Sequence, residues 1–213
     1  MRLFIAFCLS PQFLDRVQDR QNSARRLLGG GAKWVDPGNI HLTCAFLGGT
    51  AQSKLPAIKK SMDETAAAFR KIPVILGGFG GFPSLERPRV LWLGFKGGGD
   101  ALKVIAMTLC GSLTAEGFIF EHEFSAHITI ARVPPALLVP DAGVRAVPET
   151  GKRSSRCRKS GVKPFIDSAA LASMAAKTEE PDACGIVPGI ELIESMLTSA
   201  GPVYRALYSK EFL

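Results

Sequence analysis

Two short apolar stretches of the chain begin in the same way, with a histidine followed two residues later by a threonine. The first reads "HLTCAFLG" from His41, and the second reads "HITIAR" from His127. Short apolar runs bounded by glycine or polar residues are typical of buried β-strands, in which successive side chains point to opposite faces. A strand with His and Thr at alternate positions therefore has one wet face and one core face.

Alternation assigns a face to each side chain of the first stretch. His41 and Thr43 share the wet face, whereas Leu42, Cys44 and Phe46 point into the core. We therefore expect Phe46 to serve core packing rather than stacking on a nucleobase.

The second stretch follows the same rule until its end. His127 and Thr129 share the wet face, and Ile128 and Ile130 face away. Arg132 lies five residues after the histidine, so an ideal strand would send it to the core face. A β-bulge or the end of the strand would return it to the wet face.

The two triplets lie 86 residues apart, and each follows a strand, a helix and further strand signal. This arrangement predicts two similar halves. If the halves face each other about a pseudo-two-fold axis, two imidazoles and two hydroxyls converge on one cleft. Histidine suits general acid and base catalysis because its ordinary pKa is about 6.5. Threonine hydroxyls and the forked donors of Arg132 suit phosphoryl oxygens, so the set fits metal-free phosphodiester transfer.

The rest of the chain alternates strand-length apolar runs with helical stretches. We expect strands at 3–9, 40–48, 89–95 and 127–132, a short strand with a turn in 32–39, and a strand with a glycine-rich turn in 72–84. Helices are expected at 11–28, 53–70 and 100–117, and two or three closing strands in 185–213. This order predicts an α+β fold rather than a doubly wound parallel sheet. A stretch at about 134–185, rich in proline, glycine and basic residues, is expected to be a long excursion from a single domain spanning 1–213.

The net charge of +7 favours anionic partners such as RNA or nucleotides. Five scattered cysteines without metal-ligand spacing favour a reducing cytoplasm. The start "MRLFIAF" is interpreted as a buried strand rather than a signal peptide. No apolar run approaches the roughly 18 residues that span a bilayer, so we expect no membrane association, and we expect a monomer.

Three functions remain open on this reasoning. A single histidine in an apolar strand is more often structural than catalytic, but two matching triplets favour catalysis. A noncatalytic RNA- or nucleotide-binding module could use the same cleft. A metal-dependent phosphoesterase built around His122 and His127 is a third possibility, although no metal-binding motif supports it and we expect no cofactor.

The chain resembles the two-histidine phosphoesterase superfamily, and within it the RNA 2′,3′-cyclic phosphodiesterases, also called the 2′-5′ RNA ligase family. The segments that carry the resemblance are "MRLFIAF", "KWVDPGNIHLTCAFLG", "HITIAR" and "IELIESMLTSAGPVYRALYSKEFL", in this order. The resemblance covers most of the chain. Two departures stand out: Ala126 replaces the proline that often precedes the second histidine, and the stretch 134–185 is longer than in the family.

The resemblance implies a bilobal α+β fold. Each lobe would have a small antiparallel sheet with outer helices, and a positively charged groove would lie between the lobes. It places His41, Thr43, His127 and Thr129 at catalytic positions and Arg132 at a phosphate-contacting position. It further implies metal-free hydrolysis of a terminal 2′,3′-cyclic phosphate to a 2′-phosphate, and in some members reversible 2′-5′ ligation of RNA.

Overall fold

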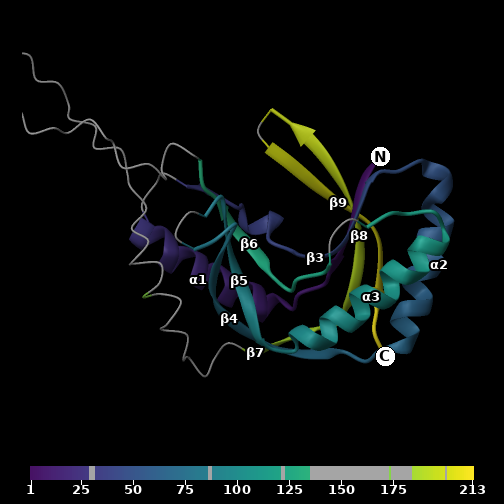
Figure 1. Cartoon of the computed structure of the whole chain (residues 1–213), viewed down its shortest axis with the longest axis horizontal. Coiled ribbons are helices and arrows are strands. Elements are labelled where there is room, and N and C mark those ends of the chain that lie inside the picture. Colours follow the sequence, from purple (N-terminus) through teal and green to yellow (C-terminus); the bar gives the residue numbers. More distant parts are fainter. Residues whose placement is uncertain (29–31, 86–87, 121–122, 135–172, 174–183, 200) are drawn as a thin grey trace, which may run out of the picture.

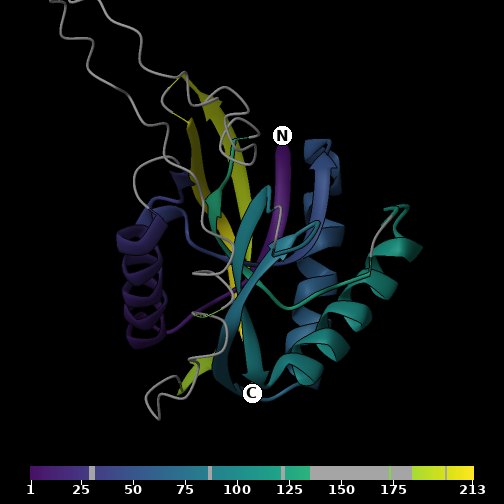
Figure 2. The ribbon, with the colours of Figure 1, turned by 60° about the vertical axis from the view of Figure 1, so that its left-hand side comes forward.

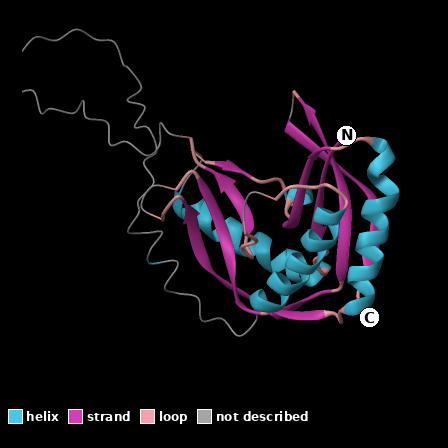
Figure 3. Ribbon diagram, turned by 45° about the vertical axis from the view of Figure 1, so that its right-hand side comes forward, coloured by secondary structure: helices cyan, strands magenta, loops and turns pink. Residues whose placement is uncertain are grey.

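The computed structural model of the chain describes residues 1–28, 32–85, 88–120, 123–134, 173, 184–199 and 201–213. Within these ranges the fold consists of two antiparallel β-sheets with helices packed beside them (Figure 1, Figure 3). The strands are β1 (Arg2–Phe7), β2 (Lys33–Trp34), β3 (Leu42–Gly49), β4 (Ile72–Phe82), β5 (Val90–Gly97), β6 (Ile128–Arg132), β7 (Cys184–Val187), β8 (Gly189–Thr198) and β9 (Gly201–Glu211). The helices are α1 (Pro11–Leu28), α2 (Leu55–Ala68) and α3 (Gly99–Ala115), with short 3-10 turns η2 (Pro37–Asn39) and η3 (Gln52–Lys54).

Each of the two sheets contains the strand of one His-x-Thr stretch. The first sheet has the strand order β3-β1-β8-β9, and the second has the order β2-β6-β5-β4-β7. Each neighbouring pair is antiparallel. β1 lies inside the first sheet with Leu3, Ile5 and Phe7 almost fully buried, so the apolar start of the chain is a core strand.

The helices pack against these sheets from two sides (Figure 2). α2 contacts β8 and β9, and α3 packs against α2, where the Ser112 hydroxyl donates a hydrogen bond to the Ser61 hydroxyl at 2.9 Å. α1 packs against β7, where the ring of Phe13 covers Gly185 so closely that a Cβ at this glycine would overlap the ring. The predicted fold class, two small antiparallel sheets flanked by helices, is confirmed.

One hydrophobic cluster joins the two sheets. It includes Leu42 and Leu192 from the first sheet and Leu91 and Ile128 from the second, all essentially without solvent exposure. Because the strands that follow the two histidines both anchor in this cluster, their relative positions are set by continuous packing.

The hairpin of β8 and β9 is longer than the sheet that carries it. β1 pairs with β8 only as far as Glu194, whereas the β8–β9 pairing continues to Thr198 and Gly201. The end of the hairpin therefore projects as a two-stranded ribbon (Figure 1). The Asn39 side-chain amide donates to the Pro202 carbonyl at 3.1 Å, which ties this ribbon to the turn before β3.

The expected helices and most of the expected strands appear, with boundaries that differ by a few residues. In 32–39 the strand is limited to Lys33–Trp34 and is followed by η2. The glycine-rich run after Leu76, expected as a turn, instead continues β4, because Gly80 and Gly81 pair with β5. Of the excursion at 134–185, the structure describes Pro134, Ser173 and the first two residues of β7. The rest of the excursion lies outside the described residues, as does His122. None of the described helices combines the length and the apolar character needed to cross a bilayer.

Candidate active site

Both histidines stand one residue before a strand, His41 before β3 and His127 before β6. In each ring, Nδ1 makes a hydrogen bond with the backbone carbonyl oxygen two residues earlier. The distance is 2.7 Å from His41 to Asn39 and 2.8 Å from His127 to Ser125. A carbonyl oxygen only accepts, so Nδ1 carries the proton in both rings. Nε2 is therefore the nitrogen left to exchange a proton in each case.

The predicted alternation of faces holds at both triplets. Thr43 is partly exposed between buried Leu42 and buried Cys44. Thr129 is partly exposed between Ile128 and Ile130, which have no solvent exposure. The wet and core faces thus lie where the sequence predicts them, one pair on each sheet.

A β-bulge follows each threonine. On β6, Thr129 pairs with Trp92 and Ala131 with Leu91, so that Ile130 has no partner on β5. The Ile130 carbonyl instead accepts from the Val35 amide at 3.0 Å and from the buried Gln21 side chain at 2.9 Å. These bonds hold the extra residue in place.

This bulge explains the orientation of Arg132. The extra residue reverses the alternation, so Ile130 and Ala131 are both buried, and exposed Arg132 returns to the face of His127 and Thr129. Of the two expected ways to turn Arg132, a bulge or the end of the strand, the structure contains the bulge. Lys33 of β2 pairs directly with Arg132, so two cations are neighbours at this edge of the second sheet.

The prediction that Phe46 packs in the core is wrong, because β3 contains the same kind of bulge. On β3, Thr43 pairs with Ala6 and Ala45 with Ile5, so that Cys44 is skipped and the alternation reverses. Phe46 is 69% exposed and shares the face of His41. It occupies the position in β3 that Arg132 occupies in β6.

The two triplets approach each other from their separate sheets. Burial lowers the pKa of His41 below the ordinary histidine value, and the nearby positive charges of His127 and Arg132 lower it further. The hydrogen bond to the Asn39 carbonyl acts in the opposite direction. β3 and β6 contact each other between the two sheets, which brings together the strands that follow the two histidines.

Different aromatic side chains surround the two imidazoles. The centroid of the His41 ring lies 4.9 Å from that of Phe4 and 5.3 Å from that of Tyr204, which stands perpendicular to it. The His127 ring lies 5.1 Å from Phe82 and 6.1 Å from Trp92. These contacts restrict both rings, and no local sequence pattern indicates them because every partner comes from a distant strand.

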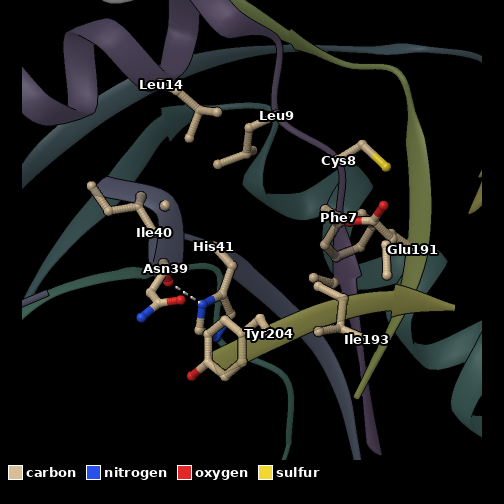
Figure 4. Close-up of a pocket in the computed structure, with 13 residues that line it drawn as sticks. Phe7, Cys8, Leu9, Leu14, Asn39, Ile40, His41, Glu191, Ile193 and Tyr204 are labelled. Carbon is tan, nitrogen blue, oxygen red and sulfur yellow. Dashed lines mark hydrogen bonds between the residues drawn. The ribbon is translucent and has the colours of Figure 1, made fainter. Parts of the chain in front are cut away.

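A cavity of about 370 Å³ opens beside His41. Figure 4 shows it extending from Asn39 and Tyr204 to Cys8 and Glu191, with apolar side chains between them. No local sequence pattern indicates this cavity, since its walls come from β1 and the residues after it, α1, β8, β9 and the turn before β3. Among the described residues, no group of three or more His, Cys, Asp or Glu side chains is arranged to hold a metal ion.

Comparison with known proteins agrees with this fold. The family model described as "LigT like Phosphoesterase" matches residues 9–92. The RNA 2′,3′-cyclic phosphodiesterase of Archaeoglobus fulgidus is 33% identical over 135 residues, which cover 62% of this chain and 73% of that protein. The enzyme of the same name from Aeropyrum pernix is 30% identical over 177 residues, 83% of this chain and 84% of that protein. That of Thermotoga maritima is 28% identical over 212 residues, 100% of this chain and 96% of that protein.

Solved structures show the same fold. A crystal structure of a protein from Thermus thermophilus matches with a TM-score of 0.69 at 23% identity, covering 100% of this chain and 98% of that one. Escherichia coli LigT in complex with NADP+ matches with a TM-score of 0.66 at 18% identity, covering 99% and 97%. The family model and these relatives thus identify a LigT-like phosphoesterase, a class of hydrolases. The chain belongs to the family of RNA 2′,3′-cyclic phosphodiesterases.

Proposed function

We propose that this enzyme hydrolyses the terminal 2′,3′-cyclic phosphate of RNA or of a nucleotide to a 2′-phosphate, without a metal ion. The observation that carries the proposal is the matched pair of imidazoles. Each has Nδ1 fixed by a backbone carbonyl and leaves Nε2 for proton transfer, and the strands that follow the two histidines contact each other. Nucleophilic attack on a cyclic phosphate needs one proton acceptor and one proton donor.

We assign the base to His41. Its lowered pKa keeps the ring neutral near pH 7, so Nε2 has a lone pair available for a proton. Nε2 takes a proton from water as the water oxygen forms a bond to phosphorus. The bond from phosphorus to the 3′ oxygen breaks, and Nε2 of the more exposed His127 gives its proton to that oxygen.

The remaining polar groups stabilise the phosphoryl oxygens in this proposal. Thr43 and Thr129 donate hydroxyl hydrogen bonds, one from each sheet. Arg132 adds a fixed positive charge and parallel N–H donors, which match the charge that develops on the phosphoryl group. Lys33 extends the positive charge beside Arg132 toward the rest of an RNA strand.

Phe46 offers a stacking surface rather than a charge. A phenylalanine that is 69% exposed on the wet face loses favourable packing unless a ligand covers it. The π-face of any nucleobase suits this ring, so we propose that Phe46 holds a base of the RNA strand without regard to its identity.

The same geometry supports ligation. If the 5′-hydroxyl of a second RNA strand takes the place of water, the attack on phosphorus produces a 2′-5′ linkage and releases the same 3′-hydroxyl. We also propose that the enzyme acts as a monomer in the cytoplasm. One chain supplies both triplets, and the described cysteines Cys8, Cys44, Cys110 and Cys184 are free thiols.

The test is incubation with the four nucleoside 2′,3′-cyclic phosphates in EDTA, with identification of the product isomer. We expect turnover to the 2′-phosphate, undiminished by the chelator. Binding without turnover would instead support a noncatalytic RNA-binding module. Loss of activity in EDTA would support a metal-dependent phosphoesterase, and formation of the 3′-phosphate would contradict the proposed leaving group.

A further inference from the structure

Glu191 of β8 lines the cavity beside His41 and has no partner there. No hydrogen bond or ion pair engages its carboxylate in the described part of the chain, and burial raises its pKa above the ordinary glutamate value. Glu194, three residues further along the same strand, pairs with Arg205 at 2.7 Å. A partly buried carboxylate without a partner lowers stability, and such groups are concentrated at binding sites.

The neighbouring thiol of Cys8 does not compensate for the burial of the unpaired Glu191 carboxylate. Burial, followed by the negative charges of Glu191 and Glu211, raises the pKa of Cys8 to about 11, so it remains a neutral thiol at pH 7. A thiol is only a weak hydrogen-bond donor. Cys8 therefore does not satisfy the carboxylate of Glu191.

The strand register fixes Glu191 relative to the phosphate-binding groups. Thr43 pairs with Ala6 across β3 and β1, and Ala6 pairs with Glu191 across β1 and β8, so the three side chains share one face in one row. Neighbouring strands lie about 4.8 Å apart, which separates Thr43 and Glu191 by roughly 10 Å. Ala6, between them in the row, also lines the cavity. This span suits the distance from the phosphate to the far edge of the base in one nucleotide.

The walls of the cavity suit a flat apolar group. Leu9, Leu14, Ile40 and Ile193 line it together with the ring of Tyr204 (Figure 4). The volume of about 370 Å³ lies in the range of small-molecule sites. A ligand that fits has apolar faces and hydrogen-bond donors along one edge.

We propose that this cavity, here called the Glu191 pocket, binds the base of the terminal nucleotide and that Glu191 selects guanine. The proposal rests on the proposed function. Guanine presents two adjacent donors, N1–H and the N2 amino group, which match the two oxygens of one carboxylate. Adenine presents the N1 lone pair at the same place, which the carboxylate repels. Uracil and cytosine each present a single donor there.

The experiment measures kcat/KM for the four nucleoside 2′,3′-cyclic phosphates with the wild type and with Glu191→Gln. The wild type is expected to prefer guanosine over adenosine by about tenfold to a hundredfold, the usual range for a bidentate base contact. A glutamine amide offers one acceptor and one donor, which complement adenine. Glu191→Gln should therefore reverse the preference rather than merely weaken binding.

Glu194→Gln is the matched control, since it removes the same charge from the same strand outside the pocket. It should keep the guanosine preference. If the wild type hydrolyses all four substrates equally, or if Glu191→Gln leaves the preference unchanged, the guanine pocket is wrong while the proposed hydrolysis stands.

A second measurement keeps the two proposals separate. Wild-type enzyme is titrated calorimetrically with guanosine 2′-phosphate and with adenosine 2′-phosphate. Tighter binding of the guanosine compound supports the pocket even if no cyclic phosphate is turned over, a result that would reject the proposed function alone. Equal binding of both compounds overturns the pocket, and this readout does not depend on whether the Glu191 variant folds.

Discussion

The two His-x-Thr triplets share a backbone and differ in their surroundings. Each histidine precedes a strand, bonds through Nδ1 to a carbonyl two residues earlier, and is followed by a bulge one residue after the threonine. After the bulge, however, β3 presents Phe46 and β6 presents Arg132. The similar backbone at the two triplets supplies two equivalent proton-transfer groups, the imidazoles of His41 and His127. The side chains around the two imidazoles differ, so we infer that their roles differ.

The same contrast extends to burial and charge. His41 lies beside the Glu191 pocket, between Phe4 and Tyr204. His127 lies near Arg132 and Lys33, on an edge that carries positive charge. We infer that the first sheet holds the base and deprotonates water, whereas the second holds phosphate groups and protonates the leaving oxygen.

The largest expected effect follows from removing either imidazole. His41→Ala and His127→Ala should each lower kcat by about 10² to 10⁴, because each removes one general acid–base group. Both variants should keep the fold, which circular dichroism checks, since neither side chain belongs to the hydrophobic cluster. A variant that hydrolyses cyclic phosphates at the wild-type rate would remove that histidine from the mechanism.

The second-largest expected effect follows from replacing Arg132, which should change a different kinetic parameter from the replacement of Phe46. Arg132→Ala should lower kcat by about 10² to 10³, as loss of a donor to a developing oxyanion does. Arg132→Lys should recover only part of this, because lysine keeps the charge without the forked geometry.

Phe46→Ala should act on KM instead. Stacking of one base on an aromatic ring is worth about 1 to 3 kcal/mol, so KM should rise by about fivefold to a hundredfold with little change in kcat. Steady-state kinetics on the same RNA oligonucleotide with a 2′,3′-cyclic phosphate end compares the two positions. If both variants changed the same parameter, the division of tasks between the bulged positions would be wrong.

A smaller effect concerns pH. The acidic limb of the kcat/KM profile reports the base of the free enzyme. Because the folded environment lowers the pKa of His41, this limb should lie below the ordinary histidine value of about 6.5. The residual activity of His41→Ala should lack the acidic limb. Persistence of that limb in the variant would assign the base to another group.

The smallest expected effect is on stability. The pKa of His41 is lower in the folded state, so the unfolded chain binds more protons between the two values. The resulting stabilisation is complete above the unfolded value and is lost as pH falls through the folded one. His41→Gln should flatten this dependence in urea unfolding at a series of pH values. If plots of unfolding free energy against pH run parallel for the wild type and for His41→Gln, burial of the neutral His41 ring does not contribute to the pH dependence of stability.

The order of strand-like and helical stretches predicted the α+β class, and the family resemblance implied the two antiparallel sheets. Local alternation predicted the faces of both triplets. Paired His-x-Thr patterns in apolar runs were enough to place His41, Thr43, His127 and Thr129. The bulges were harder to predict, since they depend on which residue of the partner strand stands opposite. Arg132 was therefore uncertain, and Phe46 was assigned to the wrong face.

The Glu191 pocket lay beyond sequence reasoning altogether. Glu191 reaches the row of Thr43 only because β1 lies between β3 and β8, and a strand order of this kind is set by tertiary packing. Tyr204 likewise contacts His41 only because the β8–β9 hairpin extends beyond the rest of its sheet. Residues brought together by such long-range pairing leave no local pattern in the sequence.

The most direct measurement is a crystal structure with a nucleoside 2′-phosphate bound. We predict that Nε2 of His41 and Nε2 of His127 both lie within about 2.6 to 3.2 Å of oxygens on or next to the same phosphorus. The two rings should approach it from opposite sides. A phosphate held by one histidine alone, with the other ring turned away, would contradict the shared acid–base mechanism.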